Sequence, residues 1–313
     1  MATAQEVTLT SIIIIVQVVG ISLNGIIVFF NFKRMKNEPV ISSSTLIYFA
    51  MGLVNVFMQL QFILQNFLSV FYPYLLFMRE VTLPVIILIL IFVLYSFWLT
   101  GWLCAYYCVT IVNTGHQLIA VLRRILSSFL PHILLLTAVG SIFMSVLCIW
   151  MLDIVSKMEP QTNNTLETSF TEAKLLINPI YLAIGALLGS FLPFIIAVTS
   201  TGVTTFTLLR HITKMKHNVS GYNRPNIQTL ISATRTMVLL LTSSTIFCVF
   251  ELMFFAGDKK KSSDSITFIG WYVVLCFPST QALIIIHAIP KLRKTILQKL
   301  FFRKEINNET YKT

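Results

Sequence analysis

Charged residues are scarce in this sequence. Asp, Glu, Lys and Arg make up 11% of its 313 residues, whereas 56% are hydrophobic, and soluble domains carry about 25% charged residues. The apolar residues come in blocks long enough to cross about 30 Å of hydrocarbon, not in short alternating runs. This composition excludes a soluble globular protein and predicts an all-α membrane protein.

The residue patterns of catalytic and metal sites are missing as well. There is no pair of intramembrane aspartates, no H-E-x-x-H helix and no glycine-rich phosphate loop, which membrane enzymes and nucleotide-binding proteins would need. The five histidines lack metal-ligand spacing, and the five cysteines all fall in apolar blocks. We therefore expect no enzyme activity, no cofactor, no metal and no disulfide. The net charge of +11 might suggest nucleic-acid binding in a soluble protein. In a membrane protein it is interpreted instead by the side of the membrane on which the charges lie.

What the sequence does contain is seven apolar blocks, each long enough to form a membrane-spanning helix. They predict a seven-transmembrane helix bundle over residues 1–289, followed by a tail over residues 290–313. The spans run over residues 9–30, 44–70, 83–112, 126–152, 180–209, 232–256 and 267–289.

Lys and Arg are distributed unequally between the two ends of this bundle. The loops after the first, third and fifth spans, the tail and Arg235 at the inner end of the sixth span account for 17 of the 23 basic residues. Since cytoplasmic loops are enriched in Lys and Arg, the N-terminus is predicted outside and the C-terminus in the cytoplasm. The sequon at Asn163 then lies in an outer loop, 153–179, and is the predicted glycosylation site.

The tail begins "PKLRKTILQKLFFRK", which places apolar residues on one helical face and basic residues on the other. This pattern favours an amphipathic helix on the anionic inner leaflet, with membrane lipids as its partners. A frayed basic tail is the alternative.

A protein with seven spans, an outer N-terminus and basic inner loops is most simply explained as a G-protein-coupled receptor. Ion channels and transporters usually thread several polar residues through their spans, whereas few polar residues lie deep in these spans. A small-molecule transporter stays open as a remoter alternative, because architecture alone does not fix function.

Four stretches carry a resemblance to one receptor family. They are "GISLNGIIVFFNFKRMK" in the first span, "WLCAYYCVTIVNTGHQLIAVLRRI" at the end of the third, "LPFIIAV" in the fifth and "FPSTQALIIIHAIPKLRK" at the end of the seventh. Together they resemble the bitter taste receptor family (taste receptor type 2) over essentially the whole chain. The resemblance implies a chemosensory receptor at the plasma membrane that binds a small bitter compound from outside and activates a gustducin-like G protein.

Three departures mark the chain as a divergent member. Its second span reads "FAMGLVN" where the family has Leu-Ala-x-Ser-Arg, so the arginine is missing. Gln281-Ala282 stands in place of the family's His-Ser, and Thr229-Leu230 in place of Ala-His. The related vomeronasal type 1 (pheromone) receptors are the alternative family.

If the fold is shared, the ligand pocket opens outward between spans 3, 5, 6 and 7. Helical periodicity counted from Tyr107 places Ile89, Leu90 and Val93 on the pocket face of span 3. This aliphatic wall favours largely apolar ligands. Trp271 is expected at the pocket near the outer end of span 7, although an interfacial tryptophan fits that place equally well.

Glu251 is a lone carboxylate in the apolar stretch "TIFCVFELMFF", one helical turn beyond Phe247 and therefore on the same face. In an open pocket it would offer a counter-charge to a cationic amine. Alternatively, it is protonated or hydrogen-bonded to a neighbouring helix. Gln65 and Asn66, near the outer end of span 2, would either bind ligand or join helices.

The candidate G-protein contacts come from the resemblance and from the basic inner loops. For any single one of these residues, plain positive-inside topology is an equally good explanation. The candidates are Asn113, His116, Arg123, Arg124, His211, Lys214, Lys216 and Arg235.

Overall fold

The computed structural model of the chain describes residues 4–39, 41–112, 117–156, 173–177, 179–217, 224–256, 264–296 and 298. Its long helices are α1 (Ala4–Asn37), α2 (Ser43–Phe71), α3 (Arg79–Ile111), α4 (Gln117–Val146), α7 (Leu192–His217), α8 (Arg224–Ala256) and α9 (Asp264–Ala288). Shorter helical segments are η1 (Pro73–Phe77), α5 (Cys148–Met151), α6 (Pro179–Gly185) and η2 (Ala186–Phe191).

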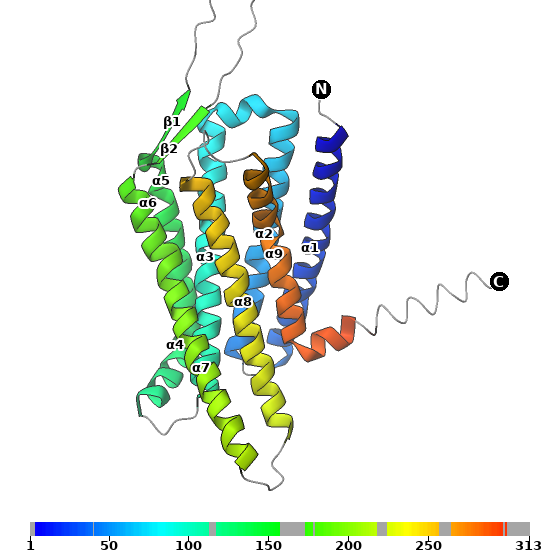
Figure 1. Cartoon of the computed structure of the whole chain (residues 1–313), viewed down its shortest axis with the longest axis vertical. Helices are drawn as coiled ribbons and strands as arrows, with labels where there is room; N and C mark the ends of the chain where they lie inside the picture. The colour runs from blue at the N-terminus through cyan, green and yellow to red at the C-terminus, as the bar shows by residue number, and fades with distance from the viewer. Residues whose placement is uncertain are drawn as a thin grey trace, which may run out of the picture.

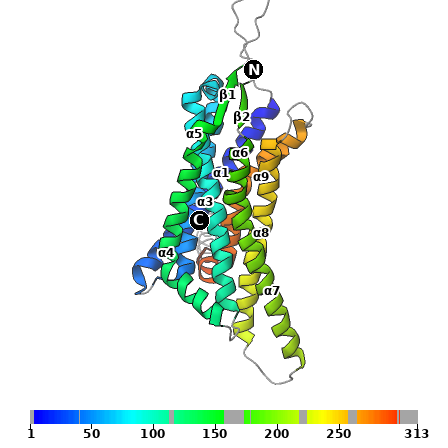
Figure 2. The same ribbon diagram turned by 90° about the vertical axis from the view of Figure 1, so that its left-hand side faces the viewer.

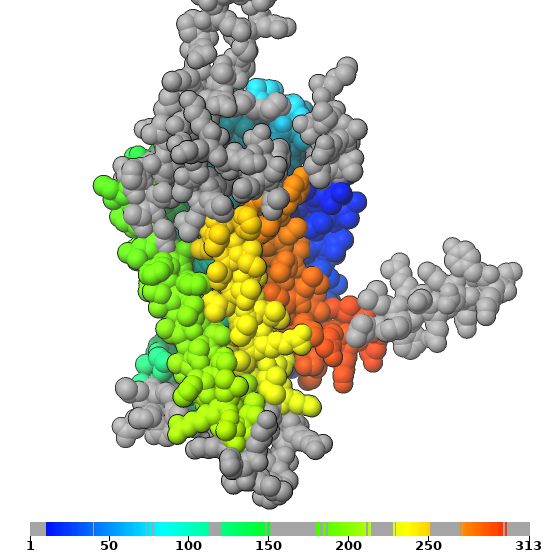
Figure 3. Space-filling model, in the orientation of Figure 1, coloured from blue at the N-terminus to red at the C-terminus, as the bar shows by residue number. Residues whose placement is uncertain are grey.

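The seven-helix bundle predicted from the apolar blocks is confirmed. Six helices are long and apolar enough to cross a membrane, and α9 becomes the seventh when the segment 272–288 is taken with the short helix Pro290–Ile296, from which it is bent by 103°. A helix pairs its own backbone N–H and C=O groups, and this is needed because hydrocarbon offers these groups no hydrogen-bond partner. Figure 3 shows α8 between α7 and α9 on one face of the bundle.

The fifth span differs from one regular helix. It is assembled from α6, the π-helix η2 and α7. Pro193 stands two residues after the π-helical turn ends at Phe191, and proline and π-helical turns both disturb the regular hydrogen-bond ladder. Gly101 on α3 lets this region approach closely, since a Cβ there would lie 3.1 Å from the Pro193 carbonyl oxygen.

A two-stranded antiparallel sheet, not expected from the sequence, joins α5 to α6. It pairs β1 (Leu152–Ser156) with β2 (Ala173–Ile177). Figures 1 and 2 show the sheet and the start of α1 at one end of the bundle, and the helix Pro290–Ile296 near the other. We call these the hairpin end and the tail end.

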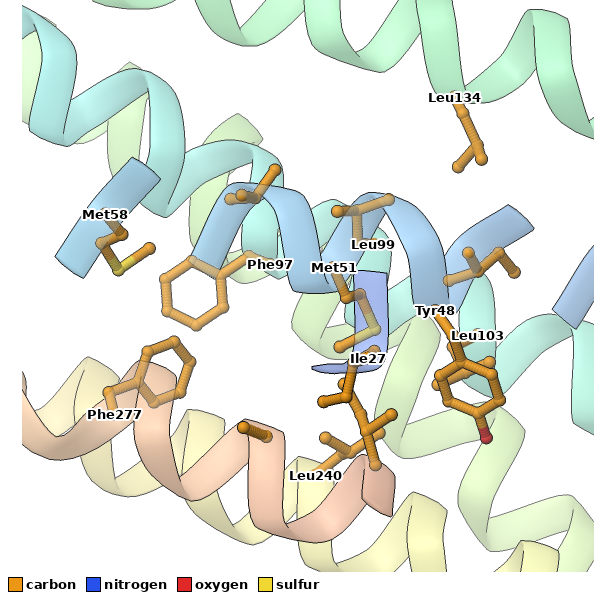
Figure 4. Close-up of a cluster of buried hydrophobic side chains, with 14 of the residues drawn as sticks. Ile27, Tyr48, Met51, Met58, Phe97, Leu99, Leu103, Leu134, Leu240 and Phe277 are labelled. Carbon is orange, nitrogen blue, oxygen red and sulfur yellow. The ribbon is translucent and has the colours of Figure 1, made fainter. Parts of the chain in front are cut away.

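Side chains sort by burial as a membrane bundle requires. Leu136 and Phe143 on α4 are 72% and 64% exposed, which in a membrane means contact with lipid. The interior holds one large apolar cluster that draws on α1, α2, α3, α4, α8 and α9, part of which is shown in Figure 4. This cluster fixes the positions of the helices whose side chains form the candidate site.

Candidate functional site

Three phenylalanines meet where α3, α8 and α9 converge. The ring centroids of Phe247 and Phe277 are 4.3 Å apart, and Phe97 lies 5.7 Å from Phe247 and 6.4 Å from Phe277. Figure 4 shows the rings of Phe97 and Phe277 turned toward each other. We call Phe97, Phe247 and Phe277 the aromatic floor.

The predicted aliphatic wall lies beside this floor on α3. Val93 is 2% exposed and stands one turn from Phe97 toward the hairpin end. Ile89, a further turn along, is half-buried and packs against the cluster that contains Val93 and Phe247. Leu90 is half-buried on α3 but is not among the members of that cluster. The structure therefore brings Ile89, Val93 and Phe247 together and leaves Leu90 at the edge.

Gln65 and Asn66 are half-buried near the hairpin end of α2. Among the described residues, Gln65 Oε1 and Asn66 Nδ2 are buried atoms that lack a hydrogen-bond partner. Unpartnered buried polar atoms carry a desolvation cost of about 1–3 kcal/mol each. A ligand or a water molecule that bonded to them would recover this cost.

Two predicted ligand contacts have side chains outside the described part of the structure. Glu251 belongs to α8 and Trp271 to α9, so their helices are the expected ones, but their side-chain positions stay predictions. Asn163, the predicted glycosylation site, also lies outside the described residues.

The region beneath the aromatic floor is tightly packed. A cavity of about 10 Å³ lies between α3, α7 and α8, bordered by Phe97, Thr100 and Pro193. It is far smaller than the roughly 300–1,000 Å³ of ligand pockets. A ligand of ordinary size would therefore not fit between these three helices as they are packed here.

A polar network that sequence reasoning did not assign connects α1, α2 and α9. Asn24 Nδ2 donates to the Pro278 carbonyl oxygen at 3.2 Å, and Asn55 Nδ2 donates to Asn24 Oδ1 at 3.2 Å. Gln59 Nε2 donates to Ser279 Oγ at 2.9 Å. Asn24 lies in the quoted stretch of the first span, and Pro278 and Ser279 lie in that of the seventh. Their place in these two stretches was the signal that the sequence offered for the network. The network holds these three helices together.

The tail end presents basic side chains. Arg123, Arg124 and Arg235 are exposed, and Arg123 Nη2 donates to the Thr110 carbonyl oxygen at 2.7 Å, which joins the start of α4 to the end of α3. Of the other predicted G-protein contacts, Asn113 and His116 lie outside the described residues, as do the side chains of His211, Lys214 and Lys216.

Comparison with protein families decides what this bundle is. The family model "Taste receptor protein (TAS2R)" matches residues 1–304. The chain belongs to the taste receptor type 2 family. It is therefore a chemosensory G-protein-coupled receptor and a multi-pass membrane protein, with a small-molecule ligand and a G protein as its general partners. Family membership supports the expectation that this taste receptor is not an enzyme.

Individual taste receptors match over nearly their full length. Taste receptor type 2 member 4 of Homo sapiens is 31% identical over 297 residues, covering 93% of this chain and 96% of its own. Taste receptor type 2 member 4 of Gorilla gorilla gorilla gives the same identity and coverage. Taste receptor type 2 member 40 of Gallus gallus is 25% identical over 293 residues and covers 91% of both chains. These identities agree with a divergent member.

The fold of this taste receptor matches that of a known receptor. Squid rhodopsin superposes with a TM-score of 0.60 and covers 94% of this chain and 85% of its own, at 12% sequence identity. The likeness shows a shared seven-helix fold and says nothing of the ligand.

Proposed function

We propose that this taste receptor binds small, largely apolar bitter compounds, including protonated amines, from outside the plasma membrane and activates a gustducin-like G protein. The observation that carries the proposal is the aromatic floor with its aliphatic wall of Ile89 and Val93, placed in the bundle interior of a chain from this family. Apolar pockets with few polar groups are typical of small-molecule sites.

The orientation of the chain follows from the distribution of its basic residues. With 17 of the 23 Lys and Arg residues in the tail, in the loops at the tail end and at Arg235, positive-inside bias favours a cytoplasmic tail end and an outer hairpin end. The helix Pro290–Ile296 then lies along the inner leaflet, where Arg293 and Lys294 can approach anionic lipid head groups.

Within the pocket, Glu251 would supply the counter-charge for an amine. It lies one turn from Phe247 along α8, on the side toward the hairpin end, so a ligand that rests on the aromatic floor would reach it. Gln65 and Asn66 would supply hydrogen bonds, and Leu90 and Trp271 additional apolar surface.

At the tail end, the basic residues would meet the G protein. Arg123, Arg124 and Arg235 are exposed there, and the remaining candidates for this contact are Asn113, His116, His211, Lys214 and Lys216. Coupling through a gustducin-like protein would raise cytosolic calcium, which gives the proposal its readout.

The test is calcium imaging of cells that express the chain with a gustducin-like G protein, exposed to amine and to neutral bitter compounds. Glu251→Gln keeps the size of the side chain and removes its charge. We expect the variant to lose its responses to amines and to keep those to neutral agonists.

Equal responses of the wild type and of Glu251→Gln would make Glu251 structural. No response from wild-type protein that surface labelling detects would overturn bitter sensing, and pheromone sensing of the vomeronasal type 1 kind would then be tested with its own ligands. Uptake of a solute without any G protein would instead favour the transporter.

A further inference from the structure

Two tyrosines near the tail end join α2 to α3. The hydroxyls of Tyr48 on α2 and Tyr107 on α3 share a hydrogen bond. Tyr48 is 4% exposed, and Tyr107 is half-buried. In the described part of the chain, neither hydroxyl has another hydrogen-bond partner. Each therefore depends on the other, because an unpartnered hydroxyl inside a bundle carries a desolvation cost.

Tyr107 also contacts a second group of buried residues. Its side chain packs against the large apolar cluster that contains Tyr48 and, in addition, against a small cluster of Cys104, Ala197 and Met237. Those three residues come from α3, α7 and α8. Tyr107 thus connects α2, through its hydroxyl, to the place where α3, α7 and α8 pack together.

That small cluster packs α3, α7 and α8 together on the tail side of the aromatic floor. Met237 and Cys104 have no exposed surface, and Ala197 is 3% exposed. Farther along, α7 and α8 project beyond the other helices at the tail end (Figures 1 and 2). We call this packing of Met237 against Cys104 and Ala197 the closed arrangement. A groove for a protein partner at the tail end could open between these helices only if Met237 left its place.

We propose that Tyr48 is a positioning residue for signalling: it holds the Tyr107 side chain toward α2 and so stabilises the closed arrangement of α3, α7 and α8. The inference rests on the proposed function, in which the G protein binds at the tail end. Tyr48 lies outside the stretches that carry the family resemblance, and it is not among the residues predicted to contact ligand or G protein. Its role follows from its hydrogen bond to Tyr107 and from the packing of Tyr107 against the small cluster.

The size of the effect follows from the strength of the bond. Hydrogen bonds between membrane helices contribute about 0.6 kcal/mol on average. Loss of the bond would therefore change the equilibrium between closed and open arrangements about threefold. Tyr48→Phe and Tyr107→Phe each remove one of the two hydroxyls and leave the rings in place. Because the hydroxyls act as one pair, the double variant should change the equilibrium no further than the larger single change.

The first measurement reports the arrangement without any G protein. Cys104 is buried in the closed arrangement, so a membrane-permeant maleimide should reach it only when the helices part. In a full-length chain whose other four cysteines, Cys108, Cys148, Cys248 and Cys276, are changed to Ala, the labelling rate of Cys104 is compared between variants. We expect Tyr48→Phe and Tyr107→Phe to raise this rate about threefold.

Tyr106→Phe is the matched control, since Tyr106 is the half-buried neighbour of Tyr107 on the same helical turn. It should leave the rate unchanged. Equal labelling rates of Cys104 in the wild type and Tyr48→Phe would overturn the proposal. So would an equal rise in Tyr106→Phe, because the effect would then not depend on the shared hydrogen bond.

The second measurement is signalling without agonist in cells, at matched surface amounts of receptor. We expect Tyr48→Phe to raise this agonist-free signal about threefold. If Tyr48 only stabilised the fold, the variant would instead lower the surface amount of receptor and the signal together. A lower basal signal at equal surface amount would overturn the proposal, since the bond would then favour the open arrangement. If the wild type activates no G protein with any agonist, the proposed function fails, and the labelling of Cys104 still decides the role of the tyrosine pair.

Discussion

Asn24 and Pro278 are 254 residues apart in the chain, yet the Asn24 amide donates a hydrogen bond to the Pro278 carbonyl oxygen at 3.2 Å. The same amide nitrogen lies within hydrogen-bonding distance of Gln59 Oε1, at 3.3 Å, and Asn24 Oδ1 accepts from Asn55. One side chain therefore fixes α1 against both α2 and α9. Because the first and the last span have no covalent connection nearby, this contact helps to close the bundle.

Asn24→Ala should destabilise the receptor by about 1–2 kcal/mol, because it leaves the buried Asn55 amide without its partner and removes the contact to the Pro278 carbonyl oxygen. Asn31→Ala is the control: Asn31 is equally buried on α1 but donates only to Ile27, one turn away in its own helix. The measurement is the apparent melting temperature of detergent-solubilised receptor. Equal losses in the two variants would show that the contacts between helices add nothing.

A second prediction uses two glycines of α1 that are five positions apart. A Cβ at Gly20 would lie 1.9 Å from Gln59 Nε2 and 2.2 Å from Ser279 Oγ, whereas a Cβ at Gly25 would meet nothing within 4 Å. Gly20→Ala should therefore cost about 1–3 kcal/mol, and Gly25→Ala should be neutral or stabilise the helix by up to about 1 kcal/mol. The surface amount and the melting temperature of the two variants are compared. A Gly20→Ala receptor that matches the wild type in both would contradict the close packing of Gly20 against Gln59 and Ser279.

The spans could be predicted because each depends only on its own residues. Any segment that crosses hydrocarbon must be apolar and must form its backbone hydrogen bonds within itself. The π-helical turn over Ala186–Phe191 and the pairing of β1 with β2 could not be predicted, for a different reason in each case. A π-helical turn has no periodicity of its own to read in so short a segment, and strands of five residues are too short for an alternating pattern to identify them inside a loop.

The candidate site was predictable to the same degree. Helical counting along span 3 identified Ile89 and Val93, and one further turn would have reached Phe97. Phe277 stood next to the proline of a quoted stretch and was still missed, because its two aromatic partners come from other helices. Tyr48 gave no signal, since a tyrosine in an apolar run is indistinguishable from other core residues until its partner is known.

Glycosylation tests the orientation of the chain directly. Three sequons are present, at Asn163, Asn218 and Asn308, and only the first is predicted to face outside. Asn163→Gln should therefore abolish the electrophoretic shift that glycosidase treatment causes, while Asn218→Gln and Asn308→Gln should preserve it. A shift that persists in Asn163→Gln and disappears in Asn308→Gln would place the tail outside and reverse the orientation.

The aromatic floor gives the last prediction. Phe247 is 1% exposed between Phe97 and Phe277, and aromatic pairs contribute about 0.5–1.5 kcal/mol beyond their buried area. Phe247→Leu keeps an apolar side chain and removes both ring contacts, so we expect agonist potency to fall by about 3- to 10-fold if ligands press on the floor. The measurement is the calcium response at matched surface amounts of receptor. Phe143→Leu, a change at a side chain that is 64% exposed on α4, is the control and should leave potency unchanged. If Phe247→Leu lowers the melting temperature but leaves potency unaltered, the floor is only part of the core and ligands bind without contacting it.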